Sequence, residues 1–430
     1  MTAASIAPPQ PARENSLTNA AIVIVVGVVA TTLSQTGVLA GLPLRNLLKN
    51  ELHVTRSASA AFMFWIGAAW YFKPLAGVFT DAFPIFGSRR RTYILVSSLM
   101  AVLCWAGLYF TPHRYGDLLW MCLVINVFMV VASTVVGGYM VETAQAMAGS
   151  GRLTAIRQTV SAVCGIIAGP ASGFLASIAF GWTAAACGGV MFLLIPAAML
   201  FLNEQRVTLS SREVLDNAGR QLKNIANART MWAAAGLMAL FYIAPGFATA
   251  LFYKQQIELH MTPQDQGNLA LIAGTCSIAT AIVYGYACRR LNLRILLFVS
   301  LLAATLTNIG YLFYFSKLDA QLIEGINGVG FTLAELALMD LAIRATPFGS
   351  EGLGFSLMLS VRNLALFGTD WIGAVLLDKF HLQFSTLVLA NSATTLVTVP
   401  LVLLLPRVLL RRKDAELYEE AAMPKTAIQE

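Results

Sequence analysis

The sequence predicts an all-α integral membrane protein with twelve transmembrane helices in two six-helix bundles. Hydrophobic residues make up 57% of the 430 residues and charged residues 12%, with a mean hydropathy of +0.69. Soluble domains carry about 25% charged residues, so this chain must cover much of its surface with lipid. Two further observations define the architecture, namely the number of apolar runs and one long polar interruption between them.

Apolar runs near the ~20 residues that a spanning helix needs occur twelve times along the chain. The 17 residues before them, with Pro8, Pro9 and Pro11, are predicted to be a disordered lead. The first run is too long for the apolar region of a cleavable signal peptide, so it is predicted to remain as a span. The predicted spans are 18–42, 57–79, 92–111, 118–141, 153–179, 182–202, 231–253, 267–288, 292–314, 321–345, 353–377 and 383–406.

The polar interruption at 203–230 separates six spans from six. Inside it, Ser210 and Glu213 have the spacing of a capping box, and apolar residues follow at helical intervals from Val214 to Ile225. This pattern predicts an amphipathic helix on the cytoplasmic surface, either a regulatory element or a passive connector. The predicted organisation is a disordered N-terminus (1–17), an N-terminal bundle (18–202), a linker (203–230), a C-terminal bundle (231–406) and a cytoplasmic tail (407–430).

The distribution of basic residues predicts the orientation. Most of the 29 Lys and Arg residues fall between alternate spans, on the side that also carries both termini. Basic residues next to spans favour the cytoplasm, so we expect both termini to be cytoplasmic and the protein to lie in the inner membrane of the cell. The net charge of +7 then reflects topology and contact with anionic lipid, and no nucleic-acid partner is expected.

A short charged loop joins the second and third spans. It contains Asp81, the turn-forming residues Pro84 and Gly87, and three consecutive arginines. Opposite charges in such a loop are typical of a gate that locks and unlocks, although a loop that only sets orientation has the same pattern. Glu142 flanks the turn between spans four and five, and Arg157 lies one helical turn deeper in span five. The predicted gating residues are Asp81, Arg89, Arg90, Arg91, Glu142 and Arg157.

The same loop carries a resemblance to a known family. Gly77-x3-Asp81 followed by Gly-Ser-Arg-Arg-Arg resembles the loop motif of the major facilitator superfamily, and the longer form Lys-Pro-x2-Gly-x3-Asp-x2-Pro-Ile, which begins at Lys73, is similar to the folate–biopterin transporter family. Other matching motifs extend over most of the chain. They are Gln35-Thr36-Gly37, Glu142, Pro245-x-Phe247, Thr262-Pro263, Arg344-x2-Pro347 and Ser360-x2-Asn363.

The resemblance implies the major facilitator fold and a secondary transporter that carries a folate- or pterin-like anion by alternating access between its halves. Gly137 stands where many family members have an acid, and Glu335, Asp340, Arg362 and Asp370 stand where apolar or small residues are expected. The resemblance therefore implies transport more firmly than it implies folate as the substrate. The alternatives are an exporter or exchanger for another small organic anion, and a membrane factor that assembles or delivers a molecule without transporting it.

Charged residues within the spans are the candidate site. An ionised group in a membrane is normally paired or faces water, so Lys73 and Arg362 are predicted to hold an anion, or else to snorkel or pair structurally. At helical rise, Glu335 and Arg362 lie at similar depth in neighbouring spans and are predicted to meet. The predicted substrate-binding residues are Lys73, Arg362, Glu335, Gln35, Tyr71 and Asn363, and protons are predicted to be carried by Glu335 or Asp340.

Other chemistry is not predicted. The six cysteines are scattered singly through the spans, and the four histidines fall in predicted outer loops, without metal-ligand spacing. There is no glycine-rich phosphate loop, which argues against direct ATP hydrolysis. We expect a protein that is not an enzyme, has no cofactor or metal, and works as a monomeric proton symporter of a small molecule in the lipid bilayer.

Overall fold

The computed structural model describes residues 11–88, 90–146, 150–202, 211–347, 350–406 and 409. The described part is built from helices, with a single isolated β-bridge between Ile85 and Ser88. This confirms the predicted all-α class. In the first half the helices are α1 (Pro11–Leu33), α2 (Gly41–Asn46), the π-helix Leu47–Glu51, α3 (Arg56–Ile66), α4 (Ala68–Tyr71), α5 (Lys73–Ala82), α6 (Arg91–Phe110), α7 (Tyr115–Ala146), α8 (Ser150–Ala176), α9 (Phe180–Phe192) and α10 (Leu194–Phe201).

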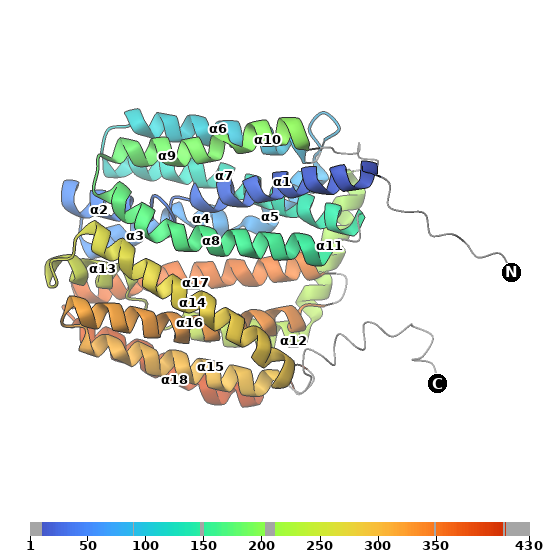
Figure 1. The fold of residues 1–430 in the computed structure, drawn as a ribbon. Helices are drawn as coiled ribbons and strands as arrows, with labels where there is room; N and C mark the ends of the chain where they lie inside the picture. The colour runs from blue at the N-terminus through green and yellow to red at the C-terminus, as the bar shows by residue number, and fades with distance from the viewer. Residues whose placement is uncertain are drawn as a thin grey trace, which may run out of the picture.

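The second half follows the linker helix α11 (Ser211–Asn227). Its helices are α12 (Arg229–Tyr242), α13 (Ala248–Ile257), α14 (Pro263–Arg290), α15 (Leu293–Ile309), the 3-10 helix Gly310–Phe313, α16 (Lys317–Ala345), α17 (Glu351–Lys379), α18 (Phe384–Leu401) and the 3-10 helix Val402–Leu404. In Figure 1 the helices of the two halves form two side-by-side layers with nearly parallel axes. Each half has its own apolar core, so the halves are two packed bodies.

Eight helices among the described residues are long and apolar enough to cross a membrane. Of the four other predicted spans, three are interrupted and one is continuous. The first span breaks at residues 34–40, the second at Gly67 and Phe72, and the seventh around Pro245, whereas the eleventh is the continuous helix α17 with charged residues inside it. Proline and glycine account for the second and seventh breaks, because proline lacks a backbone donor and glycine favours turns.

The break in the seventh span explains one unexpected charge. Asp370, on α17 and 6% exposed, accepts hydrogen bonds from the backbone N–H of Thr249 (2.9 Å) and from its hydroxyl (2.6 Å). It therefore caps the N-terminus of α13, where an acid is favoured by the exposed N–H groups and the helix dipole. The backbone of Gly246 lies directly against Gly373 of α17, with no room for a side chain at either position.

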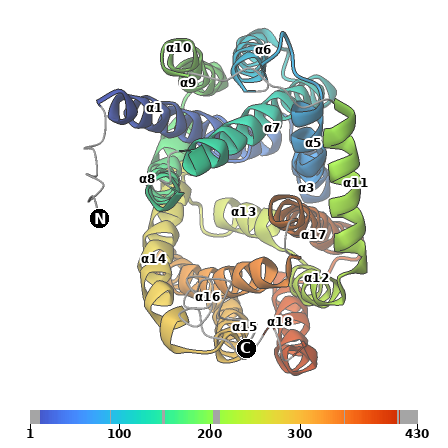
Figure 2. The same ribbon diagram turned by 90° about the vertical axis from the view of Figure 1, so that its right-hand side faces the viewer.

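The start of α1 and the end of α18 lie at one end of the bundle, which we call the terminus end (right in Figure 1). Figure 2 looks onto this end, where α11 runs along one side between the two halves, and α11 packs against α5 and α17. A helix is thus present in the predicted linker, although Ser210 of the predicted capping box is outside the described residues. The backbone of residues 11–17 is helical, whereas the sequence predicts a disordered lead there.

The two halves are joined at the other end, which we call the opposite end. Arg56 forms an ion pair with Asp378 (3.0 Å), and Asp378 also accepts from the N–H of Ser57 (2.7 Å). Nearby, the Tyr253 hydroxyl donates to the carbonyl of Val54 (2.8 Å). Between α8 and α14 the contact is closer still, because a Cβ on Gly267 would lie 2.5 Å from the carbonyl oxygen of Gly169. Small residues allow this approach.

Candidate functional site

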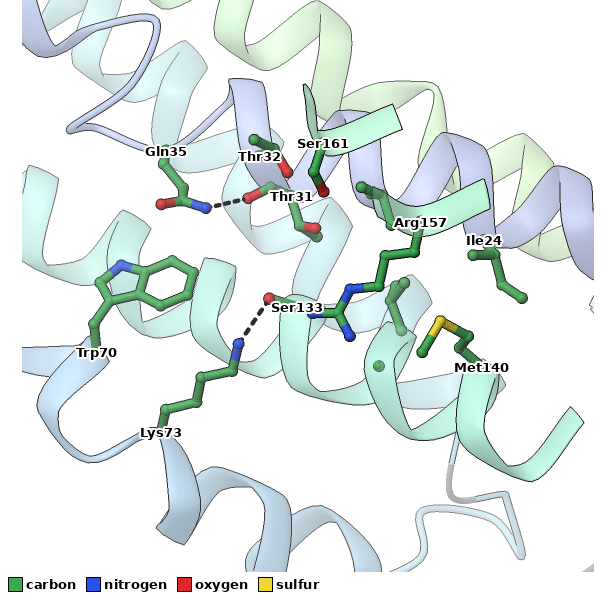
Figure 3. Close-up of a pocket in the computed structure, with 13 residues that line it drawn as sticks. Ile24, Thr31, Thr32, Gln35, Trp70, Lys73, Ser133, Met140, Arg157 and Ser161 are labelled. Atoms are coloured by element: carbon green, nitrogen blue, oxygen red, sulfur yellow. Dashed lines mark hydrogen bonds between the residues drawn. The ribbon is translucent and has the colours of Figure 1, made fainter. Parts of the chain in front are cut away.

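A polar cavity of about 170 Å³ lies in the N-terminal half, against α1, α4, α5, α7 and α8 (Figure 3). Two of the predicted substrate-binding residues, Lys73 and Gln35, line it. Arg157, which the sequence analysis assigns to the gate, lies in the same cavity. The remaining lining residues are Ile24, Val28, Thr31, Thr32, Trp70, Ser133, Val136, Gly137, Met140 and Ser161.

Broken helices position the cationic side chain of Lys73. It is the first residue of α5, directly after the break at Phe72, and lies about 13 Å along the helix from its end at Ala82. Its ammonium donates to the Ser133 hydroxyl (3.1 Å) and lies 5.2 Å from the centre of the Trp70 ring. The cation–π contact and the hydrogen bond hold the ammonium in the cavity.

Arg157 supplies the second cation, from α8. Figure 3 shows its guanidinium on the far side of Ser133 from the Lys73 ammonium, so both groups approach the same stretch of α7. Their like charges repel each other, and no acid among the described residues lines the cavity. Among the residues the structure describes, neither cation forms an ion pair. Two unneutralised cations in a polar cavity are the arrangement that binds an anion.

The remaining lining groups are fixed by hydrogen bonds to the scaffold. Gln35, in the break of the first span, donates to the carbonyl of Thr31 (2.7 Å), which leaves its carbonyl oxygen available. The Trp70 indole N–H donates to Asn126 (3.3 Å), and Asn126 in turn donates to Thr36 (2.7 Å) and to the carbonyl of Ile66 (2.6 Å). One buried asparagine therefore links both helix breaks and orients the aromatic wall of the cavity.

A second polar cluster lies in the C-terminal half around Arg362. Its guanidinium forms an ion pair with Glu335, as the sequence predicts. It also donates to Asn363 Oδ1 (3.0 Å) and to the Tyr242 hydroxyl (3.3 Å), and it lies 5.4 Å from the centre of the Tyr242 ring. Arg362 is about 16 Å along α17 from its start. The contact is confirmed, and the role of these residues in binding stays a prediction.

The other candidate residues lie apart from these two clusters. Tyr71 does not line the cavity: its hydroxyl donates to the carbonyl of Phe64 (2.8 Å), and its ring faces Phe367 of the other half at 6.4 Å. Asp340, the second candidate proton carrier, forms a two-bond ion pair with Arg344 one turn later (2.8 and 3.0 Å). Its role as a proton carrier remains a prediction. The pairing opposes that role, because an acid bound in this way is already neutralised by its partner.

The charged loop is stabilised from within. Asp81 forms an ion pair with Arg90 (2.8 Å), whose side chain is 7% exposed and lies directly against Gly138 of α7. Arg91 donates to the carbonyl of Met199 at the end of α10 (3.0 Å). Arg89 and the side chain of Glu142 lie outside the described residues. The gating role of this loop stays a prediction.

Sequence reasoning missed two contributors, Ser133, which contacts Lys73, and Glu324, which lies on α16 between two tyrosines near the opposite end. Trp70 and Tyr242 belong to aromatic segments that the sequence shows, but their contacts with Lys73 and Arg362 depend on packing. Arg157 is expected at the gate from the sequence, because counting residues gives its depth in the fifth span but not the direction of its side chain.

Comparisons with known proteins identify the family of this chain. The profile of the BT1 family matches residues 36–422. A folate-biopterin transporter of Synechocystis sp. is 26% identical over 385 residues, which cover 84% of this chain and 76% of the relative. Folate transporter 1 of Plasmodium falciparum is 23% identical over 359 residues, which cover 79% of this chain and 69% of the relative.

Solved structures show the fold. The chain superimposes on a D-xylose–proton symporter with a TM-score of 0.68 at 13% identity, covering 91% of this chain and 98% of the symporter. For the nucleoside transporter NupG the TM-score is 0.63 at 10% identity, covering 92% and 99%. Both pairs share the two-bundle fold expected of the major facilitator superfamily. The chain therefore belongs to the BT1 family, and it is a membrane transporter and not an enzyme.

Proposed function

We propose that this protein is a secondary transporter that moves a folate- or pterin-like organic anion across the membrane by alternating access, driven by protons. The observation that carries the proposal is the cavity between Lys73 and Arg157, which contains two cations and an aromatic wall at Trp70 and, among the described residues, no acid. A flat heterocycle can stack on the indole while its anionic group binds the cations. The names of the family relatives favour this substrate class.

The size of the cavity limits how much of a substrate it holds. About 170 Å³ is below the ~300–1,000 Å³ of pockets for drug-sized ligands. The cavity therefore accommodates one ring system or one carboxylate end, and a complete folate needs additional contacts from the second half, for which Arg362 and Asn363 are the candidates. The same volume favours a smaller organic anion as the second candidate substrate.

The orientation and the transport cycle belong to the proposal. With both termini cytoplasmic, the opposite end faces outward, and the contacts that join the halves there close the outer side. The central sites then open inward, and rocking of the halves about them exposes the sites alternately. The protein acts as a monomer in the inner membrane, with the loop around Asp81 as the inner gate.

Uptake by purified protein in liposomes tests the proposal. Labelled pterin or folate should accumulate when a proton gradient is imposed, and a protonophore should abolish the accumulation. Lys73→Met should weaken substrate binding about 10–100-fold, because a hydrogen bond to a charged group contributes about 1.5–3 kcal/mol. The control is Lys379→Met, at the exposed end of α17, which should bind as the wild type does. Equal binding by both variants would contradict the assignment of the cavity.

A further inference from the structure

Glu324 is the charged residue of the C-terminal half with the least usual surroundings. It lies on α16 near the opposite end, between Tyr311 and Tyr314, which are 4% and 1% exposed. The hydroxyl of Tyr311 donates to one carboxylate oxygen and that of Tyr314 to the other, each over 3.2 Å. Among the residues the structure describes, no cation pairs with Glu324, and these two tyrosines are the titratable groups that face it.

A chain of hydrogen bonds leads from Glu324 to the other half of the protein. Gln255 of α13 donates to the Tyr314 hydroxyl (2.8 Å), and Gln266 of α14 donates to Gln255 (2.9 Å). Gln256 donates to Gln266 (3.1 Å), and Lys49 of the N-terminal half donates to Gln256 (2.7 Å). Gln255 and Gln266 are 8% and 6% exposed, so the middle of the chain is shielded from competing water.

Every bond in this chain is oriented the same way. The ammonium of Lys49 can only donate and an ionised carboxylate can only accept, so the amides and the phenol between them all donate in the direction of Glu324. Hydrogen bonds aligned in this manner polarise and strengthen one another. The last bonds cross between the halves, because Gln256 also donates to Asn46 of α2 (3.2 Å). The Lys49–Gln256 bond at the opposite end is therefore linked to an acceptor at Glu324, beside the separate ion pair of Arg56 with Asp378.

We propose that Glu324 is a proton-binding site whose protonation releases the contact between the two halves at the opposite end. The inference rests on the proposed function in one respect, which is that the opposite end is the outer gate. The proton adds to a carboxylate oxygen and forms an O–H bond, which removes the negative charge and gives that oxygen a donor beside its remaining acceptor capacity.

Protonation leaves the two tyrosines with conflicting partners. Gln255 already donates to the Tyr314 hydroxyl, and Asn327 donates to the Tyr311 hydroxyl (3.0 Å). Once Glu324 donates to one of these phenols, that phenol oxygen accepts from two donors. Its own O–H can then no longer donate to the same carboxyl oxygen and is left without an acceptor. A buried hydrogen bond that is not made is costly. Reversal of the aligned chain is blocked at Lys49, which cannot accept. The strain is relieved when the bond between Gln256 and Lys49 breaks, which weakens the contact between the halves and leaves fewer bonds to be broken when they separate.

Lys49 is the other titratable group on the chain. It lies outside the predicted spans, and burial lowers the pKa of its ammonium. Titration of Lys49 would also change the contact, although in the opposite sense: loss of its proton at alkaline pH weakens the contact, whereas protonation of Glu324 weakens it at acidic pH. The direction of a pH response therefore separates the two groups.

Distance measurements between spin labels at the opposite end test the proposal. Asp117 and Gln383 are exposed and belong to different halves; each is replaced by cysteine in a chain whose six native cysteines are changed to alanine. In lipid, the distance should lengthen as the pH is lowered from mildly alkaline to mildly acidic. In Glu324→Gln, which keeps the size and cannot ionise, the distance should be long at all pH values. Tyr314→Phe, which removes one link, should lose most of the pH response.

A matched variant serves as the control. Glu258→Gln makes the same chemical change two residues beyond Gln256, at an exposed carboxylate paired with Lys254. It should keep the wild-type pH response. A response that persists in Glu324→Gln, or that disappears in Glu258→Gln, would overturn the proposal.

The uptake assay separates this inference from the proposed function. If the distance in the wild type does not respond to pH but uptake still requires a proton gradient, Glu324 is not the site and the transporter proposal stands. If neither responds to protons, proton coupling and the role of Glu324 both fail. A shift in the labelled distance needs no substrate, so it supports the inference whichever anion is transported.

Discussion

The cations within the membrane spans have different partners in the two halves of the protein. In the N-terminal half, Lys73 and Arg157 line one cavity and form no ion pair among the described residues. In the C-terminal half, Arg362 is paired with Glu335 and Arg344 with Asp340. An unpaired charge within a membrane protein costs several kcal/mol unless it faces water or a ligand. The missing partner, and not the charge itself, therefore distinguishes the proposed binding cavity from the ion pairs of the C-terminal half.

An ion pair introduced into the cavity of the N-terminal half should remove this difference between the two halves. Arg157→Glu places an acid beside Lys73, so the cavity neutralises itself and no longer attracts an anion. Substrate affinity should fall more than 100-fold, since one cation is lost and the other is occupied, each contributing about 1.5–3 kcal/mol. Thermal stability should be kept or increased. Titration calorimetry and thermal unfolding of the same sample measure both.

Arg157→Gln is the matched variant for this test, because it removes the charge without adding a partner. It should lose about 10–100-fold in affinity, the contribution of one charged hydrogen bond. If Arg157→Glu and Arg157→Gln bind equally well, Lys73 does not pair with the new acid, and the two cations do not share one anion.

In the C-terminal half, the opposite change should reveal the cost of an unpaired charge. Arg362→Ala leaves Glu335 without its partner, and breaking a fully buried pair costs about 3–5 kcal/mol. The side chain of Glu335 is 33% exposed, so the loss of stability should be smaller than that range. The double variant Glu335→Gln/Arg362→Ala should recover part of the loss, as measured by thermal unfolding in detergent.

This cycle also tests whether the pair binds substrate. If the pair only supports the fold, the double variant should take up substrate as the wild type does. If Arg362 contacts the anion, uptake should fall in Arg362→Ala and should not recover in the double variant. A double variant less stable than Arg362→Ala would contradict the pairing seen in the structure.

Much of the fold could be predicted from the sequence, because each span can be recognised from its own run of apolar residues. The division into halves and the meeting of Glu335 with Arg362 followed from run lengths and helical rise. The breaks in the first, second and seventh spans could not be predicted in the same way. Apolar content continues through Gly67 and around Pro245, so hydropathy gives no sign of the turn. Those breaks are what place Gln35 and Lys73 at the cavity.

The candidate site was harder to predict than the fold for a related reason. Depth along a helix follows from counting residues, whereas direction around the helix depends on packing. Arg157 was therefore assigned to the gate, and Asp370 was noted as an unexpected charge without its capping role. The position of Glu324 between two tyrosines depends on a turn after α15 that brings Tyr311 and Tyr314 back to α16. Only the folded chain shows that arrangement.

The loop of the N-terminal half offers a smaller test of paired charge. Asp81→Asn removes the partner of Arg90, whose side chain is 7% exposed. Because Asp81 itself is 40% exposed, we expect a loss of stability of about 1 kcal/mol or less, as for exposed ion pairs. If the loop is the inner gate, the transport rate should fall while insertion stays intact. Wild-type transport in this variant would leave the loop with a role in topology only.

The smallest effect is expected at Tyr242, which contacts Arg362 in two ways. Its hydroxyl accepts a hydrogen bond of 3.3 Å, and the guanidinium lies 5.4 Å from its ring centre. Tyr242→Phe removes only the hydroxyl. The bond is long, so its loss should cost no more than about 1 kcal/mol, or roughly fivefold in affinity for an anion that Arg362 holds.

Tyr242→Leu removes the ring as well, and with it a cation–π contact that contributes about 0.5–2 kcal/mol, depending on how far it is desolvated. The leucine variant should therefore bind more weakly than the phenylalanine variant. Equilibrium binding to both, beside Arg362→Ala, gives the order. If the ring orients the guanidinium toward a substrate, the difference between Leu and Phe should vanish in the Arg362→Ala background. A difference that persists there would mean that the ring contacts the substrate directly, or that it supports the core of this half, where Tyr242 is 4% exposed.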